Sequence, residues 1–205
     1  MTKRLFDITV SLTALLLLSP VLLLLALLVR LKLGSPVLFT QTRPGLHGEP
    51  FQMIKFRTMT NAESADGTLL PDADRLTRFG RILRATSLVE LPELWNVLKG
   101  DMSLVGPRPL LMAYLDYYTE EEMLRHTVRP GITGLAQISG RNKTSWDSRL
   151  AYDVAYAKEN SLWLDVKILF KTFSQVIKRE GVVVNPSSLY HKLSDERRKL
   201  QLCYV

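Results

Sequence analysis

The chain has 205 residues, with 27 Lys or Arg against 20 Asp or Glu, and a formal net charge of +7. This length suits a short membrane segment followed by one folded domain of about 170 residues. The sequence has no polybasic tract and no recognisable nucleic-acid-binding motif, so we expect no nucleic-acid partner despite the positive charge. Membrane lipid headgroups and phosphate-bearing substrates are the favoured partners. The one cysteine, Cys203, excludes an intramolecular disulfide.

An apolar run from Ile8 to Val29 is interrupted at Ser19-Pro20. At about 1.5 Å per residue the run could cross a bilayer core of about 30 Å, but the proline predicts a break at its centre. A spanning helix concentrates Lys and Arg on its cytoplasmic side. Here both ends are basic, which favours a re-entrant hairpin over residues 1–34 that leaves the membrane on the side it entered. A kinked spanning helix is the alternative. The flanking residues are Lys3, Arg4, Arg30 and Lys32.

The following residues, 35–184, are predicted to form an α+β domain that is mostly helical with a short β element. Residues 37–41 and the alternating segment 51–57 read as strands, joined by a turn over 43–48. Residues 129–142 contain several glycines, so we expect this segment to be irregular. A C-terminal tail, 185–205, contains a possible charged helix over 194–202. Helical spacing or end signals predict helices over 73–85, 87–99, 110–118, 120–127, 146–158 and 162–179.

The last of these helices carries one apolar stripe with lysines elsewhere on its surface. Core packing is the favoured interpretation, and docking flat on a membrane surface is the alternative. The stripe consists of Leu162, Val166, Leu169, Phe170, Phe173, Val176 and Ile177.

Four short segments place a cation beside glycine or proline in non-helical sequence. Arginine suits bidentate phosphate contacts, proline fixes the backbone that presents it, and glycine lets the backbone approach an anion. Together the four predict a phosphate or nucleotide pocket, although each could be a plain turn with a solvated charge. They are Arg43-Pro44-Gly45, Lys55-Phe56-Arg57, Gly106-Pro107-Arg108-Pro109 and Arg129-Pro130-Gly131-Ile132-Thr133-Gly134.

The segment Ser87-Leu88-Val89-Glu90 has the spacing of a capping box, in which Ser87 caps a helix and Glu90 reaches back. That structural role is the favoured interpretation of Glu90 from spacing alone. The alternative is a functional carboxylate at a positive helix terminus, close to phosphates and a divalent ion.

In this order, the motifs resemble those of the small monotopic phosphoglycosyl transferases, most closely those that transfer a bacillosamine-type sugar phosphate. The resemblance runs from about Lys3 to Gly181. Besides the Ser-Pro break and the four cationic segments, it includes Thr58-Met59, the run from Leu91 to Ser103, and Leu135-Ala136-Gln137.

The resemblance implies that the protein moves a sugar-1-phosphate from a UDP-sugar to undecaprenyl phosphate and releases UMP. This reaction is a first membrane step of polysaccharide and glycoprotein assembly, and in the family it uses Mg²⁺ and a covalent aspartyl intermediate. The resemblance also implies a monotopic protein of the bacterial inner (cytoplasmic) membrane, held by the re-entrant hairpin with its catalytic domain facing the cytosol.

Site residues follow from the same resemblance. Val89 stands at the nucleophile position, and Glu90 is an active-site carboxylate and the candidate ligand of Mg²⁺. Lys55 and Arg108 are expected to neutralise phosphates. The other candidates for the phosphate or nucleotide pocket are Arg43, Arg57, Arg129, Gln137 and Arg141.

One position departs from the family pattern, which has Asp-Glu where this chain has Val89-Glu90. Valine has no oxygen to attack phosphorus, so the covalent mechanism lacks its nucleophile. The sequence therefore indicates either an enzyme disabled at one position, which is favoured, or a protein that binds a nucleotide sugar or polyprenyl phosphate without turnover. Neither the sugar nor an oligomeric state is specified by the sequence.

Overall fold

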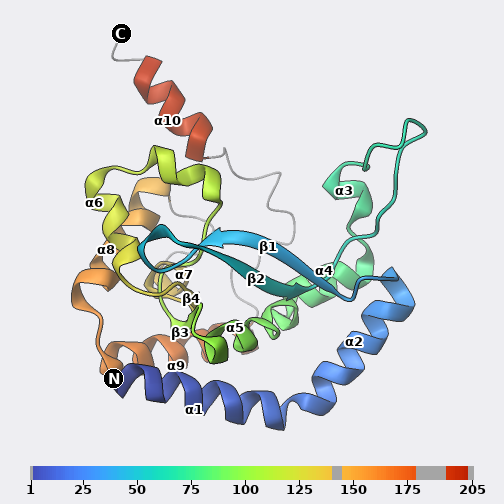
Figure 1. Cartoon of the computed structure of the whole chain (residues 1–205), viewed down its shortest axis with the longest axis horizontal. Helices are drawn as coiled ribbons and strands as arrows, with labels where there is room; N and C mark the ends of the chain where they lie inside the picture. Colours follow the sequence, from blue (N-terminus) through green and yellow to red (C-terminus); the bar gives the residue numbers. More distant parts are fainter. Residues whose placement is uncertain (1, 140–144, 179–192, 203–205) are drawn as a thin grey trace.

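The computed structural model describes residues 2–139, 145–178 and 193–202 (Figure 1). It has the predicted α+β composition, with helices around a long two-stranded hairpin and a second, very short sheet. The α-helices are α1 (Thr2–Leu17), α2 (Ser19–Leu33), α3 (Asp72–Arg75), α4 (Arg78–Ala85), α5 (Glu93–Lys99), α6 (Glu120–Met123), α7 (Leu135–Ser139), α8 (Trp146–Glu159), α9 (Leu162–Lys178) and α10 (Leu193–Leu202). The strands are β1 (Leu38–Pro44), β2 (Pro50–Phe56), β3 (Ser103–Val105) and β4 (Gly131–Thr133). The 3₁₀ turns are η1 (Leu46–Gly48), η2 (Leu88–Glu90), η3 (Met112–Tyr117) and η4 (Leu124–Thr127).

The apolar run forms two helices, α1 and α2, that meet at an angle of 64°. The predicted break at Ser19-Pro20 is confirmed: the Ser19 hydroxyl donates to the Leu16 carbonyl at 2.8 Å, and Pro20, in the first turn of α2, has no backbone N–H to donate. Among the described residues no single helix is long and apolar enough to cross a membrane. By length and composition, this bent pair is the one candidate span within the part of the chain that the structure describes.

The two helices have an outer apolar face and an inner face that packs on the domain. On the inner face, α1 runs along α5, and Leu25, Val29 and Leu33 of α2 pack with Phe56 and Leu83. The outer face is exposed along its whole length and consists of Leu5, Leu12, Leu16, Leu17, Val21, Leu23, Leu24, Leu27 and Leu31.

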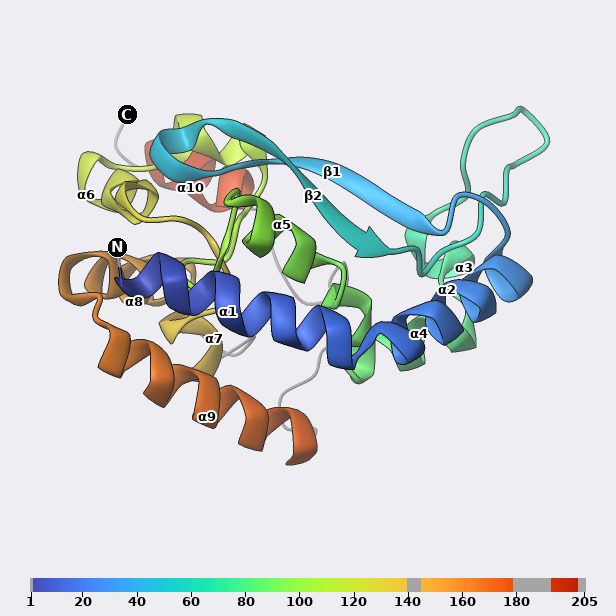
Figure 2. The same ribbon diagram turned by 60° about the horizontal axis from the view of Figure 1, so that its bottom comes forward.

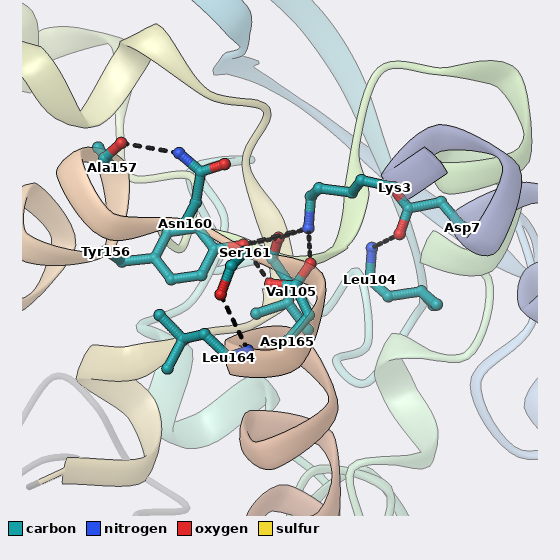
Figure 3. A network of polar contacts seen from close by, with 10 residues as sticks. All are labelled: Lys3, Asp7, Leu104, Val105, Tyr156, Ala157, Asn160, Ser161, Leu164 and Asp165. Atoms are coloured by element: carbon teal, nitrogen blue, oxygen red, sulfur yellow. Dashed lines mark hydrogen bonds and ion pairs between the residues drawn. The ribbon is translucent and has the colours of Figure 1, made fainter. Parts of the chain in front are cut away.

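The start of α1, which carries one of the two basic flanks of the apolar run, is bonded into the domain (Figure 3). The Lys3 ammonium donates to the Val105 carbonyl at 3.1 Å and forms an ion pair with the buried Asp165. The Asp7 carboxylate accepts from the Leu104 amide at 3.1 Å. Both contacts hold strand β3, so the N-terminal helix and the strand before Arg108 form one unit.

The hairpin confirms both predicted strands and the turn between them. Strands β1 and β2 pair antiparallel from Leu38–Phe56 to Pro44–Pro50. In Figure 1 the hairpin crosses the middle of the molecule, with α1 and α2 along one side and α10 on the opposite side. On β2, Met53 and Phe56 are both buried, but they lie on opposite faces of the strand and pack into two different apolar clusters, so the strand has no single buried face.

Four helix predictions differ from the structure: 110–118 contains only the 3₁₀ turn η3, 120–127 divides into α6 and η4, and two others were wrong in position. The helix expected over 73–85 is divided into α3 and α4, because Leu76 is extended and the Thr77 hydroxyl caps α4 by accepting from the Gly80 amide at 3.0 Å. The helix expected from Ser87 begins only at Glu93 and ends, as predicted, at a left-handed Gly100. Ser87 itself is left-handed, with φ 58°, and its side chain accepts no capping hydrogen bond, so the capping-box interpretation was wrong.

The expected irregular segment contains strand β4 and helix α7, because its glycines permit very close backbone contact. Strand β4 pairs parallel with β3, and a Cβ on Gly131 would lie 2.0 Å from the Gly106 nitrogen. The Gly106 amide donates to the Thr133 carbonyl at 2.9 Å and the Gly131 amide to the Pro107 carbonyl at 3.0 Å. These two N–H groups therefore donate to backbone carbonyls and serve the contact between β3 and β4.

Helix α9 is confirmed, and its apolar stripe is core only in part, since Leu169 packs against the core cluster that contains Ile168. The buried side of α9 presents Asp165 and Ile168, whereas Phe170 is 75% and Phe173 68% exposed. The favoured core-packing interpretation of the stripe is therefore wrong for these side chains. Figures 1 and 2 place α9 on the same side of the molecule as α1 and α2.

The tail contains the predicted charged helix, α10. Its first residue, Leu193, is fully buried against Tyr114, Trp146 and Leu150. Arg197 anchors the helix by donating to Glu122 at 2.5 Å and to Asp147 at 2.9 Å. The proposed division of the chain at residues 34 and 184 stays a prediction.

Candidate active site

A buried asparagine fixes the helix after position 90 onto the central hairpin. The Asn96 side chain accepts from the Ile54 amide at 3.0 Å and donates to the Gln52 carbonyl at 2.7 Å. These bonds satisfy backbone groups of β2 that have no neighbouring strand on that side, and they hold α5 next to β2. As a result, Glu93 at the start of α5 faces Lys55 on β2, with an ammonium-to-carboxylate distance of 3.0 Å.

Three of the predicted site residues meet around one carboxylate oxygen. Oε1 of Glu90 accepts from the Arg108 guanidinium at 2.5 Å and from the Lys55 ammonium at 3.2 Å. Lys55 comes from β2, Glu90 from η2, and Arg108 from the loop after β3. Because Glu93 also contacts Lys55, the site alternates two cations with two carboxylates within a few ångströms.

The electrostatics of the two carboxyl groups differ although they share Lys55. Burial alone would raise the pKa of Glu90, but the neighbouring Arg108 and Lys55 outweigh it and lower this pKa to about 2. Glu93 is more deeply buried, and burial raises its pKa despite Lys55. The pKa of Arg108 is raised, chiefly by Glu90. Glu90 is therefore ionised at neutral pH, between its two cationic partners.

Arg43 approaches this cluster from the tip of the hairpin. Its guanidinium donates to the Gln41 side chain at 2.6 Å, and its Nε is buried without a hydrogen-bond partner among the described residues. Burial lowers the pKa of Arg43, and the proximity of Arg108 lowers it further. Arg43 and Arg108 are therefore close enough for their like charges to affect each other.

Position 89 lies next to the cluster but faces a different environment. Val89 is part of the 3₁₀ turn η2, in which successive side chains diverge by about 120°. Its side chain packs against the apolar cluster of Leu25, Val29 and Leu33 from α2, while Glu90 contacts the cations. The left-handed Ser87 directs the chain into this turn.

The remaining predicted site residues are not joined to this cluster by the described contacts. Arg57 is buried and donates to the carbonyls of Ser35 at 2.5 Å and Met59 at 2.8 Å, so it secures the chain after α2. Arg129 donates to the Gly100 carbonyl at 2.9 Å. Both polar ends of the Gln137 amide are buried without a hydrogen-bond partner among the described residues. Arg141 lies outside the described residues.

Sequence reasoning missed Glu93 and Asn96 as residues that shape the site. Both lie in the run from Leu91 to Ser103, where a helix of seven residues has Glu93, Leu94, Asn96 and Val97 buried. A polar pair among apolar positions at helical spacing is the signal that could have identified them.

Comparison with known proteins identifies relatives along nearly the whole chain. Residues 1–179 match the family model described as bacterial sugar transferase. A Bacillus subtilis protein named uncharacterized sugar transferase EpsL is 55% identical over 180 residues, which cover 88% of this chain and 89% of the relative.

Two further relatives carry more specific names. The UDP-glucose:undecaprenyl-phosphate glucose-1-phosphate transferase of Caulobacter vibrioides is 46% identical, with 87% of this chain and 71% of the relative covered. The UDP-N-acetylgalactosamine-undecaprenyl-phosphate N-acetylgalactosaminephosphotransferase of Aeromonas hydrophila is 42% identical, over 87% of this chain and 44% of the relative.

Proposed function

Because the chain belongs to the phosphoglycosyl transferases of the bacterial sugar transferase family, we propose that its reaction joins a sugar-1-phosphate from a UDP-sugar to undecaprenyl phosphate. The observation that carries this proposal is the meeting of Lys55 and Arg108 at Glu90, with Arg43 nearby. A diphosphate carries several negative oxygens, and fixed guanidinium and ammonium groups are the side chains that bind them.

The reaction consists of two displacements at phosphorus when position 89 carries an aspartate. Its carboxylate oxygen forms a bond to the β-phosphorus of the UDP-sugar, and the bond from that phosphorus to the bridging oxygen breaks and releases UMP. A phosphate oxygen of undecaprenyl phosphate then attacks the same phosphorus and frees the carboxylate. Arg108 and Lys55 offset the charge that builds on the transferred phosphoryl group.

With Val89 the chain lacks the attacking oxygen, so in this proposal the sequence as it stands is inactive. The test is UMP release from UDP-sugars by the Val89→Asp variant in the presence of undecaprenyl phosphate. Val89→Asn is the matched control, since it has nearly the same shape without the nucleophilic carboxylate. Release by the aspartate variant alone supports the proposal. A folded Val89→Asp protein that binds UDP-sugars but releases no UMP would favour the alternative, a non-catalytic binding protein.

Mg²⁺ fits this site as a ligand held jointly with the substrate. Among the described residues no group of three or more His, Cys, Asp or Glu side chains could form a cage. Mg²⁺ is usually bound by one or two carboxylates together with substrate phosphates and water. Glu90, with Glu93 at the same lysine, supplies that donor set. When bound, the ion would offset charge on the diphosphate.

The membrane arrangement is proposed from two exposed apolar surfaces. One is the outer face of α1 and α2, and the other is formed on α9 by Trp163, Phe170 and Phe173. The helices that carry them, α1, α2 and α9, lie on one side of the molecule (Figure 2), and exposed apolar surfaces are typical of lipid contact. We propose a monotopic protein of the bacterial inner membrane, with α1 and α2 re-entering one leaflet and the active site facing the cytosol.

The donor sugar is proposed as a class. The relatives are named for glucose and N-acetylgalactosamine transfer, so a UDP-hexose or UDP-N-acetylhexosamine is the expected donor. The bacillosamine-type donor suggested by the motifs stays a prediction, which the same UMP-release assay across UDP-sugars tests.

A further inference from the structure

The main chain at Arg108 is held by a buried guanidinium that comes from another part of the chain. Arg125, in η4, is 2% exposed. Its Nη2 donates to the Arg108 carbonyl at 2.7 Å and to Asp153 Oδ2 at 2.8 Å, and its Nε donates to the same Asp153 oxygen at 3.2 Å. Arg125 therefore connects α8, which carries Asp153, to the loop that presents the phosphate-binding arginine.

Stability alone is a poor explanation for this arrangement. Desolvating two charges is costly, and a buried ion pair can often be replaced by apolar side chains of similar volume without loss of stability. Burial raises the pKa of Asp153 despite Arg125, which reflects that cost. An apolar pair could fill the same space, but it could not donate to the Arg108 carbonyl.

The turn η4 also packs against two of the cationic segments, Arg43-Pro44-Gly45 and Gly106-Pro107-Arg108-Pro109. The side chain of His126 lies 3.4 Å from the Gly45 carbonyl, in the turn that follows Arg43. The rings of Pro44, Pro107 and Pro109 line one small hollow together with Arg125 and His126. These proline turns are rigid and pack around the buried Arg125. The position of Arg125 therefore affects the neighbouring residues Arg43 and Arg108, which the turns carry.

We infer that Arg125, held by Asp153, is a positioning residue for Arg108. Arg125 does not contact the ligand. It fixes the peptide at Arg108 so that the Arg108 guanidinium reaches Glu90 and the diphosphate. The ligand-dependent part of this inference rests on the proposed function, whereas the part that concerns the loop does not.

The test removes the ion pair as a unit. The Arg125→Met/Asp153→Leu double variant keeps the space filled and leaves no unpaired buried charge. Its matched control is Lys158→Met/Glu121→Gln, because Lys158 and Glu121 also join α8 to α6, at 2.7 Å, but are exposed. Amide hydrogen exchange is measured over residues 104–111 and over the β1–β2 hairpin, without ligand. UDP affinity is measured by calorimetry with Arg108 present and in the Arg108→Met background.

The inference predicts faster exchange over residues 104–111 in the Arg125→Met/Asp153→Leu variant, with the hairpin unchanged. It also predicts an affinity loss of about tenfold when Arg108 is present and of less than about twofold when Arg108 is already methionine, because the effect acts through Arg108. The control variant should show neither change. If the double variant does not fold, Arg125→Lys, which keeps the charge beside Asp153 but loses the planar fork, is measured in its place.

Unchanged exchange over residues 104–111 would overturn the inference. So would an equal loss of affinity in both backgrounds, because Arg125 would then act independently of Arg108. If the unaltered protein binds no UDP, the proposed function fails, and the exchange measurement still decides whether Arg125 positions the loop.

Discussion

Glu90 and Arg108 form an ion pair with a nitrogen-to-oxygen distance of 2.5 Å although they are 18 residues apart in the sequence. Lys55 adds a second cation to the same oxygen. The pair joins η2, which contains position 89, to the loop after β3, which the N-terminal helix holds through Lys3 and Asp7. The structure thus links α1, through β3 and the loop that follows it, to Arg108 and from there to η2.

This ion pair predicts a specific pH dependence of stability. The pKa of Glu90 is about 2 in the folded protein, below its ordinary value of 4.5. A lowered pKa stabilises the fold above about pH 4.5, and this contribution is lost as the pH falls toward 2. Since Arg108 is 42% exposed, solvent reduces the contribution to about 1–3 kcal/mol.

The measurement compares the free energy of unfolding of the unaltered protein and Glu90→Gln between pH 5 and 2.5. The unaltered protein should lose more stability over that range. Glu121→Gln, which removes an exposed carboxylate paired with Lys158, is the control and should behave like the unaltered protein. Parallel curves for the unaltered protein and Glu90→Gln would show that Glu90 is not held by these cations.

Thr77 and Ser87, the two candidate helix caps, should differ in how much stability the protein loses when each is replaced by alanine. Thr77 caps α4, so Thr77→Ala should lower the free energy of unfolding by about 1 kcal/mol. Ser87 accepts no capping hydrogen bond, so Ser87→Ala should cost a few tenths of a kcal/mol at most. Chemical denaturation of both variants decides between the observed caps and the capping box predicted from the sequence, which gives the opposite order.

The contact between β3 and β4 predicts that one glycine cannot be replaced. A methyl group on Gly131 would lie 2.0 Å from the Gly106 nitrogen and 2.4 Å from the Thr133 oxygen, both backbone atoms. We expect Gly131→Ala to cost about 3 kcal/mol or more. Gly67 is a control in open space with a positive φ, so Gly67→Ala should cost about 1 kcal/mol from backbone strain alone. Similar melting temperatures for the two variants would contradict the close strand contact.

If α1 and α2 form a re-entrant hairpin, both of its ends lie on the same side of the membrane. Single cysteines at Thr2 and Gly34, in a chain with Cys203→Ser, should both react with a membrane-impermeant reagent only from the cytosolic face. Cysteine at Glu121, exposed on the domain, reports the cytosolic side as a control. Reaction of the two ends from opposite faces would establish a spanning helix instead.

The features that the sequence predicted correctly are those determined by residues close together in the chain. The Ser19-Pro20 break, both hairpin strands and the left-handed Gly100 follow from proline, alternation and glycine within a few residues. Glu90 was misread because its local spacing matched a capping box, whereas two distant cations, Lys55 and Arg108, determine its place.

Other errors have the same physical origin in long-range contacts. Helical spacing in the sequence identified an apolar stripe on α9, but the spacing does not show which part of the protein packs against the stripe. In the structure, Phe170 and Phe173 are exposed. The sequence also could not predict the ion pair between Lys3 and Asp165, which are 162 residues apart. No local pattern in the sequence contains that pairing.

The most direct test of the central claim is the intact mass of the Val89→Asp protein after incubation with a UDP-sugar and Mg²⁺, without undecaprenyl phosphate. We predict a gain equal to one sugar-phosphate group on this variant, removed when undecaprenyl phosphate is added, and no gain on the unaltered chain or on Val89→Asn. An unchanged mass for Val89→Asp, in a folded protein that binds the UDP-sugar, would contradict the assignment of position 89 as the nucleophile site.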